Sequence, residues 1–417
     1  MKKNERMSHW QIILIWTGAG ICLASIYAGN TLSGLGFFRG VVAILIGTIL
    51  GAIPMYLMSL VGTRERVSGM VSFRPAFGIR GSYIVSVINI VQLLGWVAIM
   101  IIVTQEACIQ LKIFGTGWIS EKLLIGLIGL LITVNACLGH NNWKWFQWFT
   151  VGATVILSVV MTIAVLKTYP VDSLVAIKTD GTMTTGLGID SLVGLSLAWV
   201  PLVPDYSQFA ENEKKAARGT FLGYVITSMW MFFVGLVCTL ATQNPQSSPV
   251  EVMVALNLGT LGLYVVILSG ITTAFLNVFS SGISAINILP KAKERPVVFT
   301  AGIIGTLIAL FFPINDFQGF LVLLGSFFVP LEAIVLTDYF LVRKKFDLAE
   351  LDKKGGKYWY KNGINLTAFA VFGVGFLIYE VAYYFQCSFG SSIISFVCTS
   401  LLYYLLCYSR RKDKSYE

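Results

Sequence analysis

Charged side chains are scarce in this sequence of 417 residues: Asp, Glu, Lys and Arg together make up 12%, against 56% hydrophobic residues. Soluble domains carry about a quarter of their residues as charged side chains, so this composition excludes an ordinary soluble protein. The mean hydropathy is +0.77. Apolar stretches of about 20 residues, enough for a helix to cross a bilayer, recur along the chain. The sequence therefore predicts an all-α polytopic membrane protein.

Histidine and cysteine are also scarce. The two histidines, His9 and His140, lie far apart, and the seven cysteines are scattered without paired spacing. Metal sites and disulfide frameworks need such residues at short, regular intervals. The sequence has no Ser/His/Asp set and no phosphate-binding loop either. We therefore expect no enzymatic activity and no cofactor, with a polytopic membrane enzyme as a remote alternative.

The positive charges are distributed as a membrane topology predicts. The net charge is +9, and of the 30 Lys and Arg residues 25 lie in alternate connecting segments and five in the others. This bias predicts that both termini are cytoplasmic in a multi-pass protein of the cell membrane, close to anionic lipid. It argues against a nucleic-acid partner, and we expect a monomer in the lipid bilayer. Twelve spans are predicted, at 10–31, 38–62, 83–111, 123–139, 146–166, 187–208, 219–241, 256–289, 297–313, 318–341, 363–384 and 389–408.

The first span is unusually rich in small residues. Its stretch IWTGAGICLASIYAGNTLSGLGF holds five glycines together with Ser25, Asn30 and Thr31. Small residues in membrane helices usually allow two helices to pack closely. The alternative is a helix broken near the bilayer midplane, where unwound carbonyls coordinate cations in transporters. Both interpretations are open at this point.

The third span places an amide next to an aromatic ring. Gln92 and Trp96 are four residues apart and so share a helix face. Tryptophan is common at membrane boundaries, but Trp96 lies some thirteen residues into its predicted span. We interpret the pair as part of a ligand site.

The sixth span is predicted to break. Ser196 and Trp199 are three residues apart and share a face, and Pro201 and Pro204 follow directly. Proline removes a backbone donor, so the helix is expected to end near Trp199. A broken sixth span would mirror a broken first span, as in transporters built from inverted repeats.

The eighth span contains the polar run ITTAFLNVFSSGISAINILP, residues 271–290. Thr273, Asn277 and Ser281 recur every four residues and form one stripe, with Thr272 beside it. A single Ser or Thr can bond to the carbonyl four residues earlier and means little by itself. A stripe that includes Asn needs partners in hydrocarbon, so we expect it to face a cation and a polar ligand.

Three motifs together resemble the nucleobase:cation symporter-1 family, in its cytosine permease and hydroxymethylpyrimidine transporter branch. They are VPDYSQFAENEKKAARG after the sixth span, the Gln-Gly-Trp cluster of the third, and PLEAIVLTDYFLVRKK in the tenth. The likeness covers nearly the whole chain. It implies one transporter domain over 1–417, with about twelve transmembrane helices in the fold of sodium-coupled amino-acid transporters. The implied parts are a first inverted repeat at 10–168, a second at 187–342, and two additional helices at 363–408.

The resemblance assigns substrate-binding roles residue by residue. Trp96 matches a tryptophan that stacks on the base, Gln92 matches a glutamine just before it, and Asn277 matches an amide that hydrogen-bonds the base. Ser196 falls where some relatives have an aromatic residue, and Trp199 where the hydroxymethylpyrimidine branch has a tryptophan. Ser25 falls where that branch has an acid, and here the chain departs from the pattern.

The coupling ion implied by the resemblance is sodium. Thr272 and Thr273 match the hydroxyl pair of the sodium site, and Gly20 and Leu23 are the first-span residues expected to offer carbonyl oxygens. The expected function is import of a neutral pyrimidine, cytosine or hydroxymethylpyrimidine, by sodium symport with alternating access. Two alternatives are uptake of a purine, allantoin or hydantoin, and a sodium- or proton-coupled amino-acid transporter of the same fold.

Five acids are placed in or near the spans. Glu106, Glu332 and Glu380 lie at membrane depth, where they could relay protons, and Glu332 follows Pro330 in the tenth span. Asp205 and Asp338 lie near predicted cytoplasmic ends with basic residues close by, so we expect them to anchor gates or loops.

Overall fold

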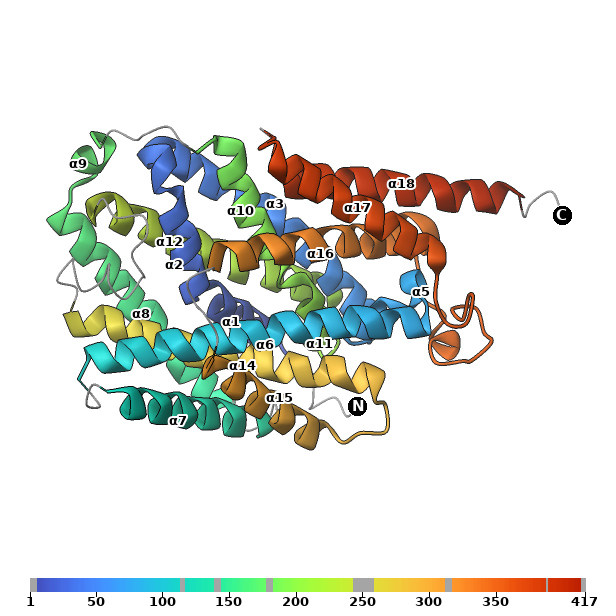
Figure 1. The fold of residues 1–417 in the computed structure, drawn as a ribbon, viewed down its shortest axis with the longest axis horizontal. Coiled ribbons are helices and arrows are strands. Elements are labelled where there is room, and N and C mark those ends of the chain that lie inside the picture. The colour runs from blue at the N-terminus through green and yellow to red at the C-terminus, as the bar shows by residue number, and fades with distance from the viewer. Residues whose placement is uncertain are drawn as a thin grey trace.

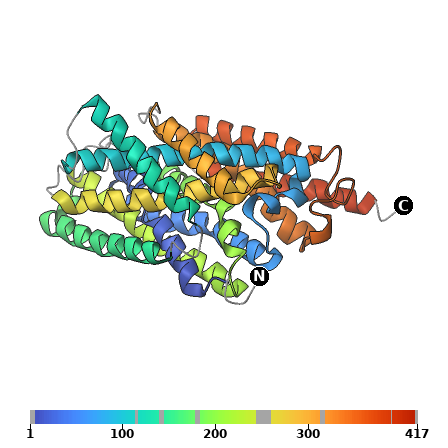
Figure 2. The same ribbon diagram turned by 90° about the horizontal axis from the view of Figure 1, so that it is seen from below.

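The computed structural model describes residues 6–112, 117–138, 144–177, 183–242, 259–311, 317–387 and 389–413. Over these ranges the protein is helical, without a strand, and nine helical segments are long and apolar enough to cross a membrane. The long helices lie side by side along a common direction in two perpendicular views (Figures 1 and 2). The chain is thus a multi-pass membrane protein with the all-α fold that its hydropathy predicts.

Each predicted span corresponds to a helix or a broken helix in the described part of the chain. Several helices continue past the predicted ends, because their terminal turns contain polar residues that the apolar pattern leaves out. The first span is α1 (His9–Gly20) and α2 (Leu23–Thr31), and the sixth is α10 (Thr185–Leu197), η3 (Val200–Leu202) and α11 (Val203–Ser207). The others are α3 (Gly36–Glu65), α6 (Ile79–Gln110), α7 (Trp118–Cys137), α8 (Lys144–Thr168), α12 (Glu213–Thr242), α14 (Gly259–Ile288), α15 (Glu294–Ala309), α16 (Phe317–Thr337), α17 (Leu366–Tyr384) and α18 (Ser391–Asp413).

The first span is broken as one interpretation predicts. α1 ends at Gly20, and Cys22 before α2 has an extended backbone with φ −117° and ψ 157°. The hydroxyl of Ser25 donates to the carbonyl of Gly20 (3.0 Å) and lies 3.2 Å from the sulfur of Cys22. The break therefore satisfies part of its exposed backbone from within its own sequence.

The other interpretation, close packing, is also confirmed. A Cβ at Gly20 would lie 2.1 Å from the hydroxyl of Thr227 on α12, and one at Gly29 would lie 2.1 Å from the carbonyl oxygen of Phe232. In the opposite direction, a Cβ at Gly223 or Gly235 of α12 would collide with carbonyls of α1 and α2. The glycines thus hold both halves of the broken helix against one continuous helix.

The sixth span is broken at its prolines. α10 (Thr185–Leu197) is followed by the 3-10 turn η3 (Val200–Leu202) and by α11 (Val203–Ser207), each of the last two with proline in its first turn. A short helix, α4 (Gly69–Ser72), packs against this turn so closely that a Cβ at Gly69 would lie 1.9 Å from the carbonyl oxygen of Pro201. The prolines have the effect that the sequence predicts.

The third and eighth spans form the centre of the bundle. α6 and α14 are antiparallel neighbours: Asn89 donates to the hydroxyl of Ser284 (2.8 Å), and Thr104 packs on Gly270. α7 and α15 lie together on one side of this pair, and α17 and α18 lie together on the opposite side of the molecule (Figure 1).

Candidate substrate and cation site

Asn277 lies level with Trp96 across the contact between α6 and α14. The Asn89–Ser284 hydrogen bond fixes the register, because Trp96 lies seven residues after Asn89 and Asn277 lies seven residues before Ser284. Both side chains are buried, at 6% and 2% exposed. The structure therefore brings the predicted aromatic and amide groups of two spans to one depth.

Gln92 joins this level to the break in the sixth span. Its Nε2 donates to Oδ1 of Asn89 (2.8 Å) and to the carbonyl of Ala198 (3.2 Å), which lies between α10 and η3. Because a backbone carbonyl only accepts, this contact fixes the amide orientation and turns Oε1 away. Among the described residues, Oε1 is buried without a hydrogen-bond partner.

Five aromatic rings form two groups around this level. Trp96 contacts Phe320 of α16 edge to face, with centroids 5.4 Å apart. Trp199 meets Trp16 of α1 at 6.3 Å, and Trp16 meets Tyr206 of α11 at the same distance. The Tyr206 hydroxyl donates to a backbone carbonyl of α14, at Leu276 (3.3 Å). The two predicted tryptophans are nearly buried, so the conformation described here is closed around them.

The polar stripe of α14 divides into two parts. Towards its C-terminal end, Ser281 bonds to the carbonyl of Val278, and Asn287 donates to the hydroxyls of Ser82 and Ser86 on α6. One turn or more earlier, Nδ2 of Asn277 and Oγ1 of Thr273 are buried without a partner among the described residues. Ser281, the last residue of the predicted stripe, is thus bonded within α14 itself, and Asn287, which lies beyond the stripe, is bonded to α6. That Thr273 and Asn277 face a ligand stays a prediction.

A second serine on α14 contacts the break in the first span. The hydroxyl of Ser269 donates to the carbonyl of Ile21, between α1 and α2, at 2.8 Å. Thr272 and Thr273 follow one turn later on α14, and their place beside the broken backbone stays a prediction. The Thr272 hydroxyl bonds back to the carbonyls of Leu268 and Ser269, each at 3.0 Å.

Of the two first-span residues predicted to face the ion, Gly20 is the last residue of α1 and Leu23 the first of α2. The Gly20 carbonyl accepts from Ser25 and the Ile21 carbonyl from Ser269. Both carbonyls thus accept a hydrogen bond from a serine, and a role of Gly20 and Leu23 in holding sodium stays a prediction.

Ser196 lies apart from this group. Its hydroxyl donates to the carbonyl of Leu192 (2.8 Å) and accepts from the hydroxyl of Tyr224 on α12 (3.1 Å). Its Cβ also fills the space left by Gly51 of α3. This position between three helices favours a packing role for Ser196, and the hydroxyl of Ser25 is likewise used inside the break.

The acids near the predicted cytoplasmic ends act as the anchors that the sequence predicts. Asp205 accepts from the backbone N–H of Gly69 in α4 (2.8 Å), and Asp338 accepts from Arg343 (2.7 Å) and from the hydroxyl of Tyr403 (2.8 Å). The partner of Asp205 is a backbone N–H rather than a basic side chain. Glu332 differs from both, since both of its oxygens are buried without a partner among the described residues.

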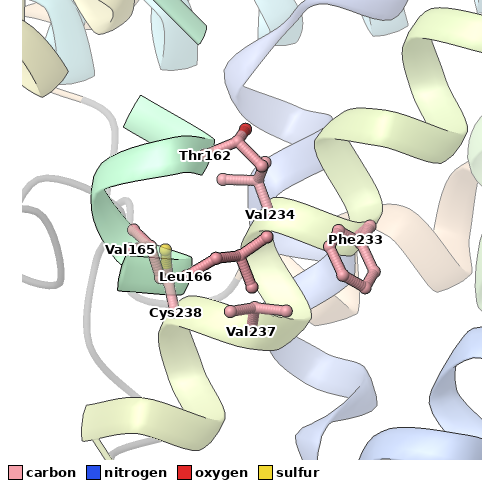
Figure 3. Close-up of a pocket in the computed structure, with 7 residues that line it drawn as sticks. All are labelled: Thr162, Val165, Leu166, Phe233, Val234, Val237 and Cys238. Carbon is pink, nitrogen blue, oxygen red and sulfur yellow. The ribbon is translucent and has the colours of Figure 1, made fainter. Parts of the chain in front are cut away.

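A small cleft between α8 and α12 is a separate feature (Figure 3). Its lining is apolar except for the hydroxyl of Thr162, which accepts from the indole of Trp230 (2.9 Å). None of the predicted site residues lines it, and it has no polar group free to orient a ligand. Its lining residues are Thr162, Val165, Leu166, Phe233, Val234, Val237 and Cys238.

Ser269, Asn89, Trp16 and Tyr206 are the central residues that the sequence analysis missed. Ser269 lies three residues before Thr272 and so shares a helix face with the hydroxyl pair, which is a signal that the sequence does contain. The only sign in the sequence that Trp16 and Tyr206 are central is that each lies next to a predicted helix break.

The chain is similar to known membrane permeases over most of its length. Residues 2–406 match a family model described as permeases for cytosine/purines, uracil, thiamine and allantoin. The chain is 25% identical over 358 residues to the cytosine permease of Escherichia coli strain K12, which covers 83% of this chain and 81% of the relative. It is 24% identical over 393 residues to the hydantoin permease of Microbacterium maritypicum, covering 88% and 80%.

Solved structures show the same fold. Mhp1, a nucleobase-cation-symport-1 family transporter in a closed conformation with bromovinylhydantoin bound, matches with a TM-score of 0.83 at 22% identity, covering 96% of this chain and 92% of that one. A Na+-coupled sialic acid symporter matches at 0.70 and 14% identity, covering 97% and 90%. These likenesses show the fold expected from the sequence, while the repeat boundaries at 10–168, 187–342 and 363–408 stay a prediction.

Proposed function

Because this chain belongs to the nucleobase:cation symporter-1 family, we propose that it imports a neutral pyrimidine, cytosine or hydroxymethylpyrimidine, together with sodium. Family membership makes it a nucleobase transporter rather than an enzyme. The proposed pyrimidine rests on the side chains at the level of Trp96, and the proposed ion on Thr272, Thr273 and the break in the first span.

One observation carries the substrate proposal. Gln92 presents a buried, unpartnered acceptor on α6, and Asn277 presents a buried, unpartnered donor on α14. Leaving such a group unpaired costs about 1–3 kcal/mol, so a ligand that pairs with both recovers that free energy. Cytosine and hydroxymethylpyrimidine each carry an amino group next to a ring nitrogen, which supplies one donor and one acceptor on atoms separated by a single ring carbon.

The two tryptophans support a flat ring. Trp96 and Trp199 come from the spans that also supply Gln92 and the Ala198 carbonyl to which it bonds. Stacking on an aromatic side chain contributes about 1 kcal/mol beyond the area that it buries. We assign Trp96 and Trp199 to stacking, and Gln92 and Asn277 to the polar edge of the ring.

Sodium is proposed as the coupling ion. The hydroxyls of Thr272 and Thr273, with carbonyls of the broken first span near Gly20 and Leu23, would hold it. The buried Thr273 oxygen without a partner supports this assignment. Each cation that moves with a neutral substrate adds about 2.3 kcal/mol per 100 mV of membrane potential, enough for roughly fifty-fold accumulation. We further propose a monomer in the cell membrane with both termini cytoplasmic.

The test uses purified full-length protein. Thermal shift is measured with cytosine, hydroxymethylpyrimidine, uracil, allantoin and hydantoin, each in sodium and in choline, and labelled uptake into proteoliposomes follows. We expect stabilisation by cytosine or hydroxymethylpyrimidine that requires sodium. Stronger stabilisation by hydantoin or allantoin would replace the pyrimidine, and equal affinity in choline would replace sodium. Competition by amino acids would favour the amino-acid alternative.

A further inference from the structure

Glu332 is a buried acid that the proposed function does not use. It lies on α16, is 1% exposed, and neither carboxylate oxygen has a hydrogen-bond partner among the described residues. A charged carboxylate without partners in the interior of a membrane protein costs several kcal/mol. The ionised form is therefore strongly disfavoured in this conformation.

Two arginines on the elements packed against α16 are already paired. These elements are α3, α10, α17, α18, the π-helical segment η5 (Asp338–Arg343), and α6, whose Trp96 contacts Phe320 of α16. Their buried or ion-paired titratable groups are Arg64, Glu65, Cys108, Asp190, Asp338, Tyr339, Arg343, Tyr379 and Tyr403. Arg64 pairs with Glu213, and Arg343 with Asp338, each at 2.7 Å. Neither cation is available to neutralise Glu332.

Their positions along α16 also separate them from Glu332. Asp338 lies six residues further on, or about 9 Å at 1.5 Å per residue. In the other direction, Gly325 packs on the Tyr379 hydroxyl seven residues earlier, about 10 Å away. Glu332 thus lies between two polar contacts without reaching either.

The helix around Glu332 has two irregular points. Pro330 removes one backbone donor two residues before it, and the regular helix ends at Thr337, where η5 begins. Proline and π-helical turns are the usual places where helices bend. α16 therefore has built-in sites for the movement that would bring water to Glu332.

We propose that Glu332 is a proton-binding site: it carries a proton in the closed conformation and releases it when the transporter opens. Substrate binding, which closes the protein, then takes up one proton. Closing is favoured at low pH and becomes harder as the pH rises above the range in which an exposed glutamate titrates. Substrate affinity should fall by about tenfold per pH unit, which is the slope for one linked proton.

The first experiment rests on the proposed function, since it measures cytosine affinity in saturating sodium between about pH 6 and about pH 8. The parent protein should weaken by roughly tenfold per unit, and Glu332→Gln should bind with little pH dependence. Glu332→Asp should keep the slope. Glu380→Gln is the matched control, because Glu380 is a half-buried acid on the adjacent α17, and it should behave like the parent.

A second substrate separates the two ideas. If cytosine does not bind the parent at any pH, the proposed function fails, and the same pH series with hydantoin or allantoin, whichever stabilises the protein, still tests Glu332. The melting temperature of the empty protein should have the same pH dependence in the parent, in Glu332→Gln and in Glu332→Met, because an exposed acid titrates in the open protein as it does in the unfolded chain. The proton site is overturned if substrate affinity in the neutral variants keeps the parent's pH dependence, or if both variants fail to fold, since a neutral side chain should fit where a protonated acid does.

Discussion

Replacing Asn277 by leucine should weaken substrate binding without destabilising the empty protein. Its Nδ2 is buried and without a partner among the described residues, so the empty protein already bears the cost of an unpaired donor. Leucine removes that donor and offers the ring edge nothing in return. The ligand then loses one hydrogen bond, which is worth about 1–3 kcal/mol, or about 5- to 150-fold in affinity.

The chain offers a matched control on the same helix. Asn287 is also a buried amide of α14, but its Nδ2 donates to Ser82 and Ser86 at 3.0 and 2.9 Å, and its Oδ1 accepts from Arg74 at 3.0 Å. Asn287→Leu breaks these bonds and leaves Arg74 without this acceptor. We expect it to lower the stability of the empty protein by about 1 kcal/mol or more per lost bond.

The assay measures apo melting and substrate uptake per folded molecule for both variants. Asn277→Leu should melt like the parent and lose uptake, whereas Asn287→Leu should melt earlier and keep uptake in the molecules that remain folded. Asn277→Ala serves to exclude overpacking by the larger leucine. Normal uptake by a less stable Asn277→Leu protein would refute the binding role and would make this amide a structural one.

Three further substitutions test the other parts of the site. Trp96→Ala should abolish detectable binding of the pyrimidine while the protein remains folded, since an aromatic pair adds about 1 kcal/mol to the area it buries; unchanged affinity by thermal shift would contradict this role. Thr273→Ala should lower sodium and substrate affinity by the same factor, and Thr272→Ala by less, because only the Thr272 hydroxyl already bonds to backbone carbonyls. The sodium dependence of substrate binding, measured for both threonine variants, checks this expected order. Tyr206→Phe removes the hydroxyl that joins α11 to α14 and should speed hydrogen exchange across Val203–Ser207; unaltered exchange would show that the bond does not hold α11.

The features that could be predicted are those whose physical cause lies within one stretch of the sequence. Hydropathy gave the spans, and Pro201 and Pro204 gave the break in the sixth, because proline acts on its own helix. The helical spacing alone places Gln92 and Trp96 on one face of α6. Their roles in binding stay predictions.

The rest of the site depends on which neighbouring helix each helix face packs against. The periodicity of the sequence does not specify that neighbour. Asn277 and Asn287 have the same chemistry and lie on one helix, yet only Asn287 has Ser82, Ser86 and Arg74 within reach. The first of these partners is 205 residues away in the chain. For the same reason, the sequence did not reveal that the hydroxyl of Tyr224 on α12 donates to the hydroxyl of Ser196.

The glycine contacts between the first span and α12 restrict how the transporter can move. α1 and α2 each touch α12 with backbone against backbone or hydroxyl, at Gly20, Gly29, Gly223 and Gly235, where even a methyl group would collide. Because α1 and α2 both pack tightly against α12, they do not rotate independently of each other. The break at Ile21 and Cys22 therefore interrupts the backbone hydrogen bonds of the helix but does not act as a hinge. α1, α2 and α12 should therefore travel as one unit, and access to the centre must change by displacement between this unit and the pair formed by α6 and α14.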